Sequence, residues 1–400
     1  MGKSIHFFGH SVFGQLTSLI DRNLIDHSVK ITGSDRFCKG FHTKDHLISM
    51  LFCCLSQSNS LREVVAGCLG LLGKAEQIGL SHLPKRSTLS DANAKRTPKV
   101  FELIYHKLLS QHRQFISDSR VKLQTDNPLF IIDSTSISLF KEILKSVGRK
   151  PISGQSKGGI KAHVLMDAQL GVPDLVWYTS AAATDVGILD KIPYKKGAIY
   201  VFDKGYNDYN RWLGIESAGS YFVTRLKENA TYTTVEELEI ADDIHSGVLK
   251  DELIALPIRK NGKPVESVKF RRIAFWDDEQ KRVFSFVTNL KDFRADQIAN
   301  LYKQRWQIET LFKSLKQNFP LKYFLGDNEN AIIIQIWCAL IANLLLVVLG
   351  NKIKRPWSFS NLVSFVRVHL FNLINIVSFL NEPEKDWQKD FFSQLSLFQT

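Results

Sequence analysis

The chain has 400 residues, of which 44 % are hydrophobic and 23 % charged, with a net charge of +12 and a pI near 9.3. This length exceeds what one hydrophobic core usually serves, and the apolar content excludes a disordered chain, so two or three globular domains are expected. The positive charge favours a polyanionic partner, and nucleic acid fits it better than a membrane surface.

The cysteines and the N-terminal residues indicate a cytoplasmic protein. The five cysteines are odd in number and lack the spacing of metal ligands. The N-terminal stretch MGKSIHFFGHSVFGQL contains no continuous apolar run of the kind that a signal peptide needs. Reduced thiols in the cytoplasm are therefore expected.

Residues 1–125 are predicted to form a helical, DNA-binding domain. This segment carries 17 Lys and Arg against 9 Asp and Glu, which is most of the excess positive charge of the chain. Ser60 with Glu63 forms a capping box at the start of one helix. Lys85 and Arg86 precede a basic helix in an arrangement similar to a helix-turn-helix, so both are predicted DNA contacts. A helical bundle with a solvated basic edge explains the same pattern equally well.

From residue 128 onward the period of the apolar residues changes from that of helices to that of strands. Short runs rich in Ile, Val and Phe are typical of buried strands. Their order along the chain is β-β-β-α-β-α-β, followed by segments that alternate like antiparallel strands. A helix is predicted over 295–318. This order predicts an α/β domain over 126–330, with a mixed sheet flanked by helices and a β-rich insertion at about 230–290.

Residues 331–400 are predicted to form a helical C-terminal region. The stretch 331–350 is apolar and long enough to span a bilayer. Gln335 and Asn343 interrupt it, and it follows directly on a helix with charges of both signs. We therefore expect a buried core helix and no membrane partner, with a membrane anchor as the alternative.

Three carboxylates are the candidate catalytic residues. Asp133 and Asp203 each end an apolar strand, where clefts form in α/β proteins, and Glu309 lies on the later helix. Each acid alone is explained as a turn, cap or solvated helix residue. Together they can hold two divalent cations ~3.5–4 Å apart, a geometry that serves in-line attack at phosphorus. Oxygen ligands favour Mg²⁺, with Mn²⁺ as a substitute, so two such ions per site are expected.

The same helix carries polar residues at helical spacing. Counting from Tyr302, Arg305 lies at i+3 and Glu309 at i+7. Lys316 follows at i+14, so all four share one face of a regular helix, and Trp306 is predicted to pack beside them. Arg305 and Lys316 can clamp DNA phosphates, and Tyr302 can stack on a base or donate its hydroxyl group to a phosphate. The alternative is an exposed ion pair between Arg305 and Glu309.

These motifs resemble the DDE transposases of bacterial insertion sequences, of the insertion-sequence-four type. The stretch YKQRWQIETLFKSLK matches the Tyr-(2)-Arg-(3)-Glu-(6)-Lys signature of that family, and FIIDST and VFDKGY resemble its two aspartate blocks. SYFVTRLKEN resembles its strand with an Arg-x-Lys-x-Asn run, here Arg225, Lys227 and Asn229. The likeness spans roughly residues 5–345. One departure is mild: Lys204, after the second aspartate, is often Arg in relatives.

The resemblance implies a fold, a reaction and partners. The fold is an RNase H-like catalytic core, and the metal ligands are Asp133, Asp203 and Glu309. The reaction is cut-and-paste DNA transposition by a homodimer, in a bacterial cytoplasm and associated with the nucleoid. Its partner is double-stranded DNA, namely the terminal inverted repeats of the element and the target. The residues that contact the transposon end are Tyr302, Arg305 and Lys316.

Further residues of this domain are predicted to contact DNA: Arg225, Lys227, Lys161 and His163. Lys161 and His163 lie on one face of the second strand, where a basic edge facing water is an equal alternative. His163 is interpreted as a phosphate contact or a satisfied structural histidine. Thr184 or Asp185 is predicted to cap a helix, with a catalytic pair as the alternative. Trp276 is predicted to pack in the core, with a role in holding a flipped base as the alternative.

Two other functions fit part of this pattern. An RNase H-like, structure-specific nuclease would cut DNA without joining it, but the basic N-terminal segment and the companions of Glu309 argue against it. An inactive DNA-binding relative is expected to lack a carboxylate, and all three are present. The transposase is therefore the leading hypothesis.

Overall fold

The structure is a computed structural model that describes residues 10–70, 78–118, 125–138, 159–240, 247–260, 263–321 and 323–385. The chain divides into two compact units. One unit, called the helical unit below, joins Met1–Ser119 with Ser314–Thr400, and the other, called the sheet unit, is Arg120–Lys313. The helical N-terminal segment, the mixed sheet and the C-terminal helices agree with the predicted order of structure along the chain.

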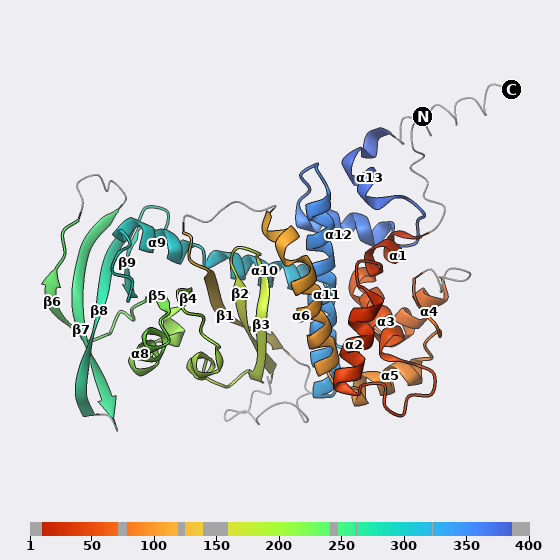
Figure 1. The fold of residues 1–400 in the computed structure, drawn as a ribbon, viewed down its shortest axis with the longest axis horizontal. Helices are drawn as coiled ribbons and strands as arrows, with labels where there is room; N and C mark the ends of the chain where they lie inside the picture. Colours follow the sequence, from red (N-terminus) through yellow and green to blue (C-terminus); the bar gives the residue numbers. More distant parts are fainter. Residues whose placement is uncertain are drawn as a thin grey trace. The chain divides into compact units, whose positions relative to one another are not determined.

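The sheet unit contains a nine-stranded sheet among its described residues (Figure 1). The spatial order of the strands is β3-β2-β1-β4-β5-β9-β8-β7-β6. β1 pairs antiparallel with β2 and parallel with β4, and β4 pairs parallel with β5. The strand bounds are β1 Leu129–Ser138, β2 Gly159–Asp167, β3 Val172–Ser180, β4 Ile199–Phe202, β5 Tyr221–Arg225, β6 Thr233–Glu237, β7 Val248–Lys260, β8 Lys263–Asp277 and β9 Arg282–Thr288.

The central strands are apolar because both of their faces are covered. β4 is the run Ile-Tyr-Val-Phe, and each of its four side chains is buried. Parallel strands covered on both faces show this continuous apolar pattern. Trp212 of α8 (Tyr209–Ser217) packs on Phe222 of β5 and Phe270 of β8 in the same core. The core therefore holds β1, β4 and β5 rigidly beside one another.

The parallel pairing of β1 and β4 fixes which residues lie opposite each other just beyond the paired segment. Ile132 lies opposite Phe202 in this register. Asp133 is the next residue on β1 and Asp203 directly follows the end of β4, so the fold places them side by side. Two 3₁₀ helices flank β4, η1 (Val186–Lys191) before it and η2 (Lys204–Tyr206) directly after Asp203.

The single helix predicted over 295–318 is two helices in the structure. α9 covers Ala295–Lys303 and α10 covers Trp306–Asn318. Between them the backbone N–H groups of Arg305 and Ile308 bond to the carbonyl groups three residues earlier. This pattern is tighter than that of an α-helix and interrupts its regular period. The prediction of one continuous helix was therefore wrong, and Arg305 lies in the turn between the two.

Trp306, the first residue of α10, also differs from its prediction. Its side chain is 58 % exposed, whereas Ile308, Leu311 and Phe312 on the same helix are buried. Because α10 begins at Trp306, this residue does not continue the apolar face of α9. The prediction that it packs was wrong.

The helical unit is built from both ends of the chain. The N-terminal segment contributes α1 Val12–Thr17, α2 Arg22–Thr32, α3 Thr43–Ser56, α4 Leu61–Leu69, α5 Arg86–Lys95 and α6 Lys99–Asp118, and the C-terminal segment contributes α11 Glu329–Lys352, α12 Phe359–Val368 and α13 Ile376–Asn381. α11 packs against α3, α5, α6 and α12, and it lies beside α6 in Figure 1. α11 is therefore the helix around which the two ends of the chain assemble.

The burial of α11 decides between the core helix and the membrane span. Its most apolar window has a mean hydropathy of 2.7, which is enough to cross a membrane by composition, but 89 % of that window is buried inside the protein. Gln335, fully buried, donates hydrogen bonds to the carbonyl groups of Pro320 (2.5 Å) and Tyr323 (2.8 Å) and accepts one from the N–H of Leu325 (2.9 Å). Gln335 thus holds the segment that leads into α11, and the prediction of a buried core helix is confirmed.

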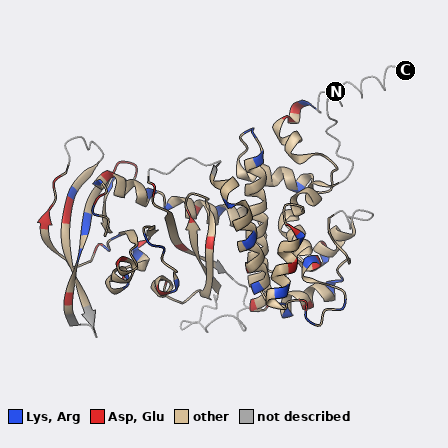
Figure 2. Ribbon diagram, viewed as in Figure 1, with Lys and Arg blue, Asp and Glu red and all other residues tan. Residues whose placement is uncertain are grey.

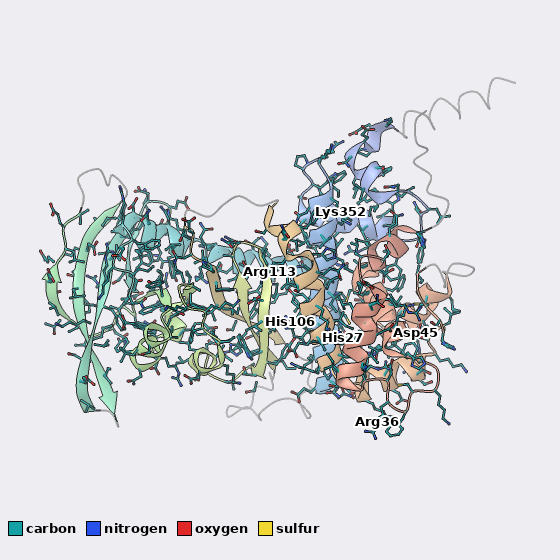
Figure 3. The ribbon with its side chains drawn as sticks, in the orientation of Figure 1. His27, Arg36, Asp45, His106, Arg113 and Lys352 are labelled. Carbon is teal, nitrogen blue, oxygen red and sulfur yellow. The ribbon has the colours of Figure 1, made fainter. Side chains whose placement is uncertain are left out.

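Buried polar groups join other helices of this unit. Asp45 of α3, labelled in Figure 3, accepts a hydrogen bond from the N–H of Ser81 (2.7 Å). His46 bonds to Asn93 of α5 (2.7 Å), and burial, aided by the charge of Arg96, lowers its pKa to about 3. His46 is therefore a neutral, structural histidine at pH 7.

The predicted helix starts agree with the structure in part. Ser60 caps α4 by accepting a hydrogen bond from the N–H of Glu63. α5 begins at Arg86, with Lys85 as its N-cap residue, and both side chains are exposed. α4 ends at Leu69, so more than a short turn separates it from α5. Residues 71–77 of that connection lie outside the described residues.

Replacing Gln335 by leucine is expected to destabilise the helical unit. Leucine fills a similar volume but leaves the N–H of Leu325 and two carbonyl groups buried without partners, at about 1–3 kcal/mol for each unsatisfied group. We expect the urea midpoint to fall for Gln335→Leu. Gln317→Leu, at an exposed position of α10, is the control and should change the free energy of unfolding by less than about 0.5 kcal/mol. Equal midpoints for the two variants would contradict the role of Gln335.

Candidate active site

Asp133 and Asp203 lie side by side at the end of the parallel pairing of β1 and β4. Asp133 is 19 % exposed and its Oδ1 accepts a hydrogen bond from the N–H of Ser134 (2.8 Å). Asp203 accepts one from the hydroxyl group of Tyr302 (3.4 Å). The charge of Arg225 lies 3.9 Å from its Oδ1. The two acids therefore keep their own partners, although their strands are adjacent.

Arg305 connects the third acid to the first. Its Nη1 donates to Oδ2 of Asp133 (3.0 Å), and its Nη2 donates to Oε1 of Glu309 (2.5 Å). The guanidinium group is only 14 % exposed and lies 5.8 Å from the ring of Tyr302. One arginine thus binds an acid of β1 and an acid of α10 at the same time. The structure brings Asp133, Asp203, Glu309, Tyr302 and Arg305 into one cluster, here called the acid cluster.

The electrostatics of the acid cluster disfavour a third negative charge. Burial raises the pKa of Asp133 from its ordinary 3.8 to about 6. The N–H of Ser134 and the charge of Arg305 lower that pKa, and the charges of Asp203 and Glu309 raise it. Since the net effect is upward, one arginine does not compensate the burial and mutual repulsion of these carboxylates. Such a cluster favours the binding of cations.

The donor set of the acid cluster suits a hard divalent cation. Its three carboxylates offer only oxygen, which Mg²⁺ and Mn²⁺ prefer. Their positions do not converge on one point, because among the described residues there is no group of three His, Cys, Asp or Glu side chains placed to hold a metal ion. Arg305 lies between two of the acids instead. The chemistry of the residues fits a metal, but in this structure the guanidinium group of Arg305 lies between Asp133 and Glu309.

Lys161 binds Asp185 and His163 lies beside it, although sequence reasoning did not assign Asp185 to the site. The Asp185 carboxylate accepts from Lys161 Nζ (3.0 Å) and from the hydroxyl group of Ser134 (3.0 Å), next to Asp133. His163 Nδ1 is 3.6 Å away, and its Nε2 bonds to Thr179 (2.7 Å). Asp185 is the N-cap residue of η1, as predicted, but its side chain makes no cap bond there and accepts from Lys161 and Ser134 instead. The sequence holds no signal for this cluster, because its members come from β1, β2 and the loop before η1.

The surroundings of His163 bear on its predicted contact with DNA. The side chain is fully buried, and burial lowers its pKa to about 4. A neutral, buried imidazole offers no exposed surface to a phosphate. Lys161 also donates to the carbonyl group of Ala183 (2.9 Å). In this structure both side chains support the strand that carries Asp133.

A basic pocket of about 260 Å³ adjoins Asp203. Its cationic lining residues are Lys204, Arg225, Lys227, Arg272 and Arg282. Arg225 lies over the rings of Phe284 (5.0 Å) and Tyr302 (6.0 Å), so this one side chain joins the pocket to the acid cluster. Figure 2 shows Lys and Arg on β7 and β8 as well. The predicted DNA contacts Arg225 and Lys227 thus share one basic pocket.

The remaining predicted contacts lie elsewhere. Lys316 lies exposed in the last turn of α10, beyond the residue at which the sheet unit ends. Lys85 and Arg86 lie exposed at the start of α5 in the helical unit. Trp276 is half-buried and donates from its Nε1 to Asp278 (2.9 Å).

Comparisons with known proteins match two segments of this chain to families and much of its length to transposases. Residues 124–345 match the family "Transposase DDE domain", and residues 8–81 match a domain of unknown function, DUF4372. The protein "Putative transposase y4zB" of Sinorhizobium fredii is 34 % identical over 68 % of this chain and 74 % of its own length. The "Probable transposase for insertion sequence element IS5377" of Geobacillus stearothermophilus is 28 % identical over 62 % of this chain and 64 % of its own.

Among solved structures, a cryo-EM structure of a piggyBac transposase synaptic complex with hairpin DNA matches with a TM-score of 0.42 and 12 % identity. The match covers 97 % of this chain and 83 % of that one.

Asp133→Asn is expected to change the dependence of stability on pH in the presence of EDTA. Because the pKa of Asp133 is higher in the folded protein, about 6, than in the unfolded chain, the folded wild type binds the proton more tightly. It therefore loses stability as the pH rises from about 4 to about 7. The variant lacks this loss, so its stability relative to wild type should increase over that range by about 1–3 kcal/mol.

Urea unfolding at several pH values measures this difference. Asp278→Asn, at an exposed position, is the control and should show a difference from wild type that does not change with pH. If the difference in stability between Asp133→Asn and wild type does not change with pH, the carboxylate of Asp133 in the wild type ionises as it does in water.

Proposed function

Because this chain belongs to the family of transposases with a DDE domain, we propose that Asp133, Asp203 and Glu309 are its three catalytic carboxylates. The protein is a transposase of an insertion sequence, an enzyme that cleaves DNA and transfers strands, and its family works with divalent metal ions. The observation that carries the assignment of residues is the register of β1 and β4, which places Asp133 beside Asp203. Arg305 links Asp133 to Glu309 and so brings the third acid to the pair.

We propose that the catalytic domain has an RNase H-like fold. The order β3-β2-β1-β4-β5, with the first three strands antiparallel and β4 and β5 parallel to β1, supports this assignment. The hairpin strands β6, β7 and β8 come between β5 and the helices α9 and α10 in the sequence, where the β-rich insertion was predicted. We also propose that residues 1–125 include the domain that binds the transposon ends.

The three carboxylates would hold two Mg²⁺ ions, for which Mn²⁺ can substitute. When bound, these ions activate a water molecule or a 3′-hydroxyl group and neutralise the charge that develops on the phosphate. The chain's own residues bind and orient the DNA strand. Arg305 offers two donors that match the oxygens of a phosphate, and Tyr302 offers a hydroxyl group beside Asp203. Tyr302 keeps its proton at pH 7 as tyrosines ordinarily do, and burial raises its pKa further, from 10 to about 12.

The basic pocket supplies the next contacts in this proposal. Arg225 reaches from Asp203 into the pocket, where Lys227 is also exposed, and Lys316 and the pair Lys85 and Arg86 add cations on α10 and α5. The partners are then the terminal inverted repeats and the target DNA, in a bacterial cytoplasm and close to the nucleoid. We propose cut-and-paste transposition by a homodimer in the synaptic complex.

Glu309→Gln tests the catalytic assignment. A neutral amide keeps the size of the side chain but binds a divalent cation weakly, so DNA binding should persist while nicking and joining fall by about a hundredfold or more. Cleavage and strand transfer of an element-end duplex in Mg²⁺ measure this loss. Glu216→Gln on α8 removes an exposed carboxylate and should leave both reactions unchanged. Full strand transfer by Glu309→Gln would remove Glu309 from the mechanism.

Neutralising Lys85 and Arg86 tests the role of the helical unit in DNA binding. Each phosphate contact that is lost removes about one counterion from the release on binding, so the slope of log K against log[salt] should fall by about 1–2 for the double glutamine variant. Binding to a short duplex, titrated with salt, measures the slope. Lys191 and Lys196, exposed in the sheet unit, form the control pair and should leave the slope unchanged. An unchanged slope for the Lys85 and Arg86 variant would show that these two residues do not contact DNA phosphates.

A further inference from the structure

Arg305 is the cation that two of the three carboxylates share in this structure. Two different nitrogens of its guanidinium group bind Asp133 Oδ2 and Glu309 Oε1. Oδ1 of Asp133 is also taken, by the N–H of Ser134. A metal ion that approaches Asp133 therefore meets an acid whose two oxygens both have partners. Of these partners, the backbone N–H is fixed by β1, whereas the arginine side chain can move.

The hydrogen bonding of Arg305 in this position is incomplete. Its Nε is buried and has no hydrogen-bond partner. A guanidinium group that binds a phosphate or a single carboxylate side-on uses neighbouring nitrogens and satisfies more of its donors. Here the group is divided between two acids on different elements. The contacts with the acids therefore leave Arg305 with an unmet donor that another anion could satisfy.

The backbone at Arg305 departs from a regular α-helix. The residue lies in the tight turn between α9 and α10, where hydrogen bonds run to the residue three positions earlier. Short stretches of this kind within helical segments often mark a hinge. The ring of Tyr302, 5.8 Å from the guanidinium carbon, provides a neutral surface along which the side chain can turn.

We propose that Arg305 and divalent cations compete for Asp133 and Glu309, so that a metal ion binds only when Arg305 leaves them, and that a DNA phosphate draws Arg305 away. This proposal rests on the assignment of the acid cluster as a metal site and adds a coupling between strand binding and metal binding. A divalent ion and a guanidinium group repel each other strongly at the distance of a shared carboxylate. Both cannot bind the same oxygens at full strength.

The competition has a thermodynamic consequence for the free protein. If Arg305 must leave before the metal binds, removing its charge increases the affinity for metal. If Arg305 serves only as a phosphate contact, its removal leaves that affinity unchanged. By linkage, a phosphate that favours the displaced arginine must favour the metal by the same factor. Such a device would load the site with metal when a strand is in place.

Calorimetric titration of Ca²⁺ into metal-stripped protein without DNA tests the first part. We expect Arg305→Gln to bind Ca²⁺ about tenfold more tightly than wild type, within the usual range of coupling between two sites. Arg305→Lys should bind with an intermediate affinity, since one ammonium group cannot span both acids as the guanidinium fork does. If Arg305→Gln does not fold, the Ca²⁺ affinity of Arg305→Lys still tests the proposal. Lys303→Gln removes an exposed charge two residues away and should bind like wild type.

The second part uses the same titration with a short DNA duplex present, corrected for Ca²⁺ bound by the duplex alone. The duplex should raise the affinity of wild type by about the factor that Arg305→Gln gains without DNA, and should raise that of Arg305→Gln much less. An equal gain in both proteins would overturn the coupling. Equal or weaker Ca²⁺ binding by the Arg305 variants without DNA would overturn the competition.

The proposal and the metal site on which it rests fail in different ways. If wild type binds Ca²⁺, Asp203→Asn abolishes that binding and the Arg305 variants match wild type, the metal site stands and the competition is wrong. If neither wild type nor Arg305→Gln binds Ca²⁺, the assignment of the carboxylates as metal ligands is itself wrong, and the competition is overturned with it.

Discussion

The parallel register of β1 with β4 is the constraint on which the site depends. Hydrogen bonds between the strands place Ile132 opposite Phe202, and the covalent chain then delivers Asp133 and Asp203 at one level. A shift of one residue would turn one of these acids to the opposite face of the sheet. The buried core around β4 holds that register, because every side chain of the strand is enclosed. The apolar packing of the sheet thus determines the separation of two charged groups.

Placing acids together in a partly buried site creates an electrostatic problem, and the fold answers it with an arginine. Burial and the charges of its neighbours raise the pKa of Asp133 to about 6, even though Arg305 opposes the shift. The carboxylates that remain uncompensated by Arg305 favour the binding of a further cation. Arg305 supplies one positive charge to the acids in this structure. In the proposed mechanism a DNA phosphate draws it away, and divalent ions then bind the carboxylates that it leaves.

The two ends of the chain form one compact helical unit, and the sheet unit lies between them in the sequence. α11 makes this possible, because its apolar surface packs against helices of both ends. Its hydropathy alone equals that of a membrane span. Gln335 distinguishes this core helix from a membrane span. Its buried side chain makes hydrogen bonds to three backbone groups of the segment that precedes α11. One polar residue therefore carries more information here than the apolar run around it.

The sequence by itself determined the order of strands and helices, the mixed sheet, the buried character of α11 and the three acids, because these follow from local periodicity and short motifs. Tertiary structure decided the break between α9 and α10, the exposure of Trp306, the partners of Asp185 and the place of Arg305. Arg305 and Asp133 are 172 residues apart in the chain. Patterns of neighbouring residues cannot reveal such a pair. The Coulomb energy between Arg305 and Asp133 depends on the distance between them, which only the folded sheet sets.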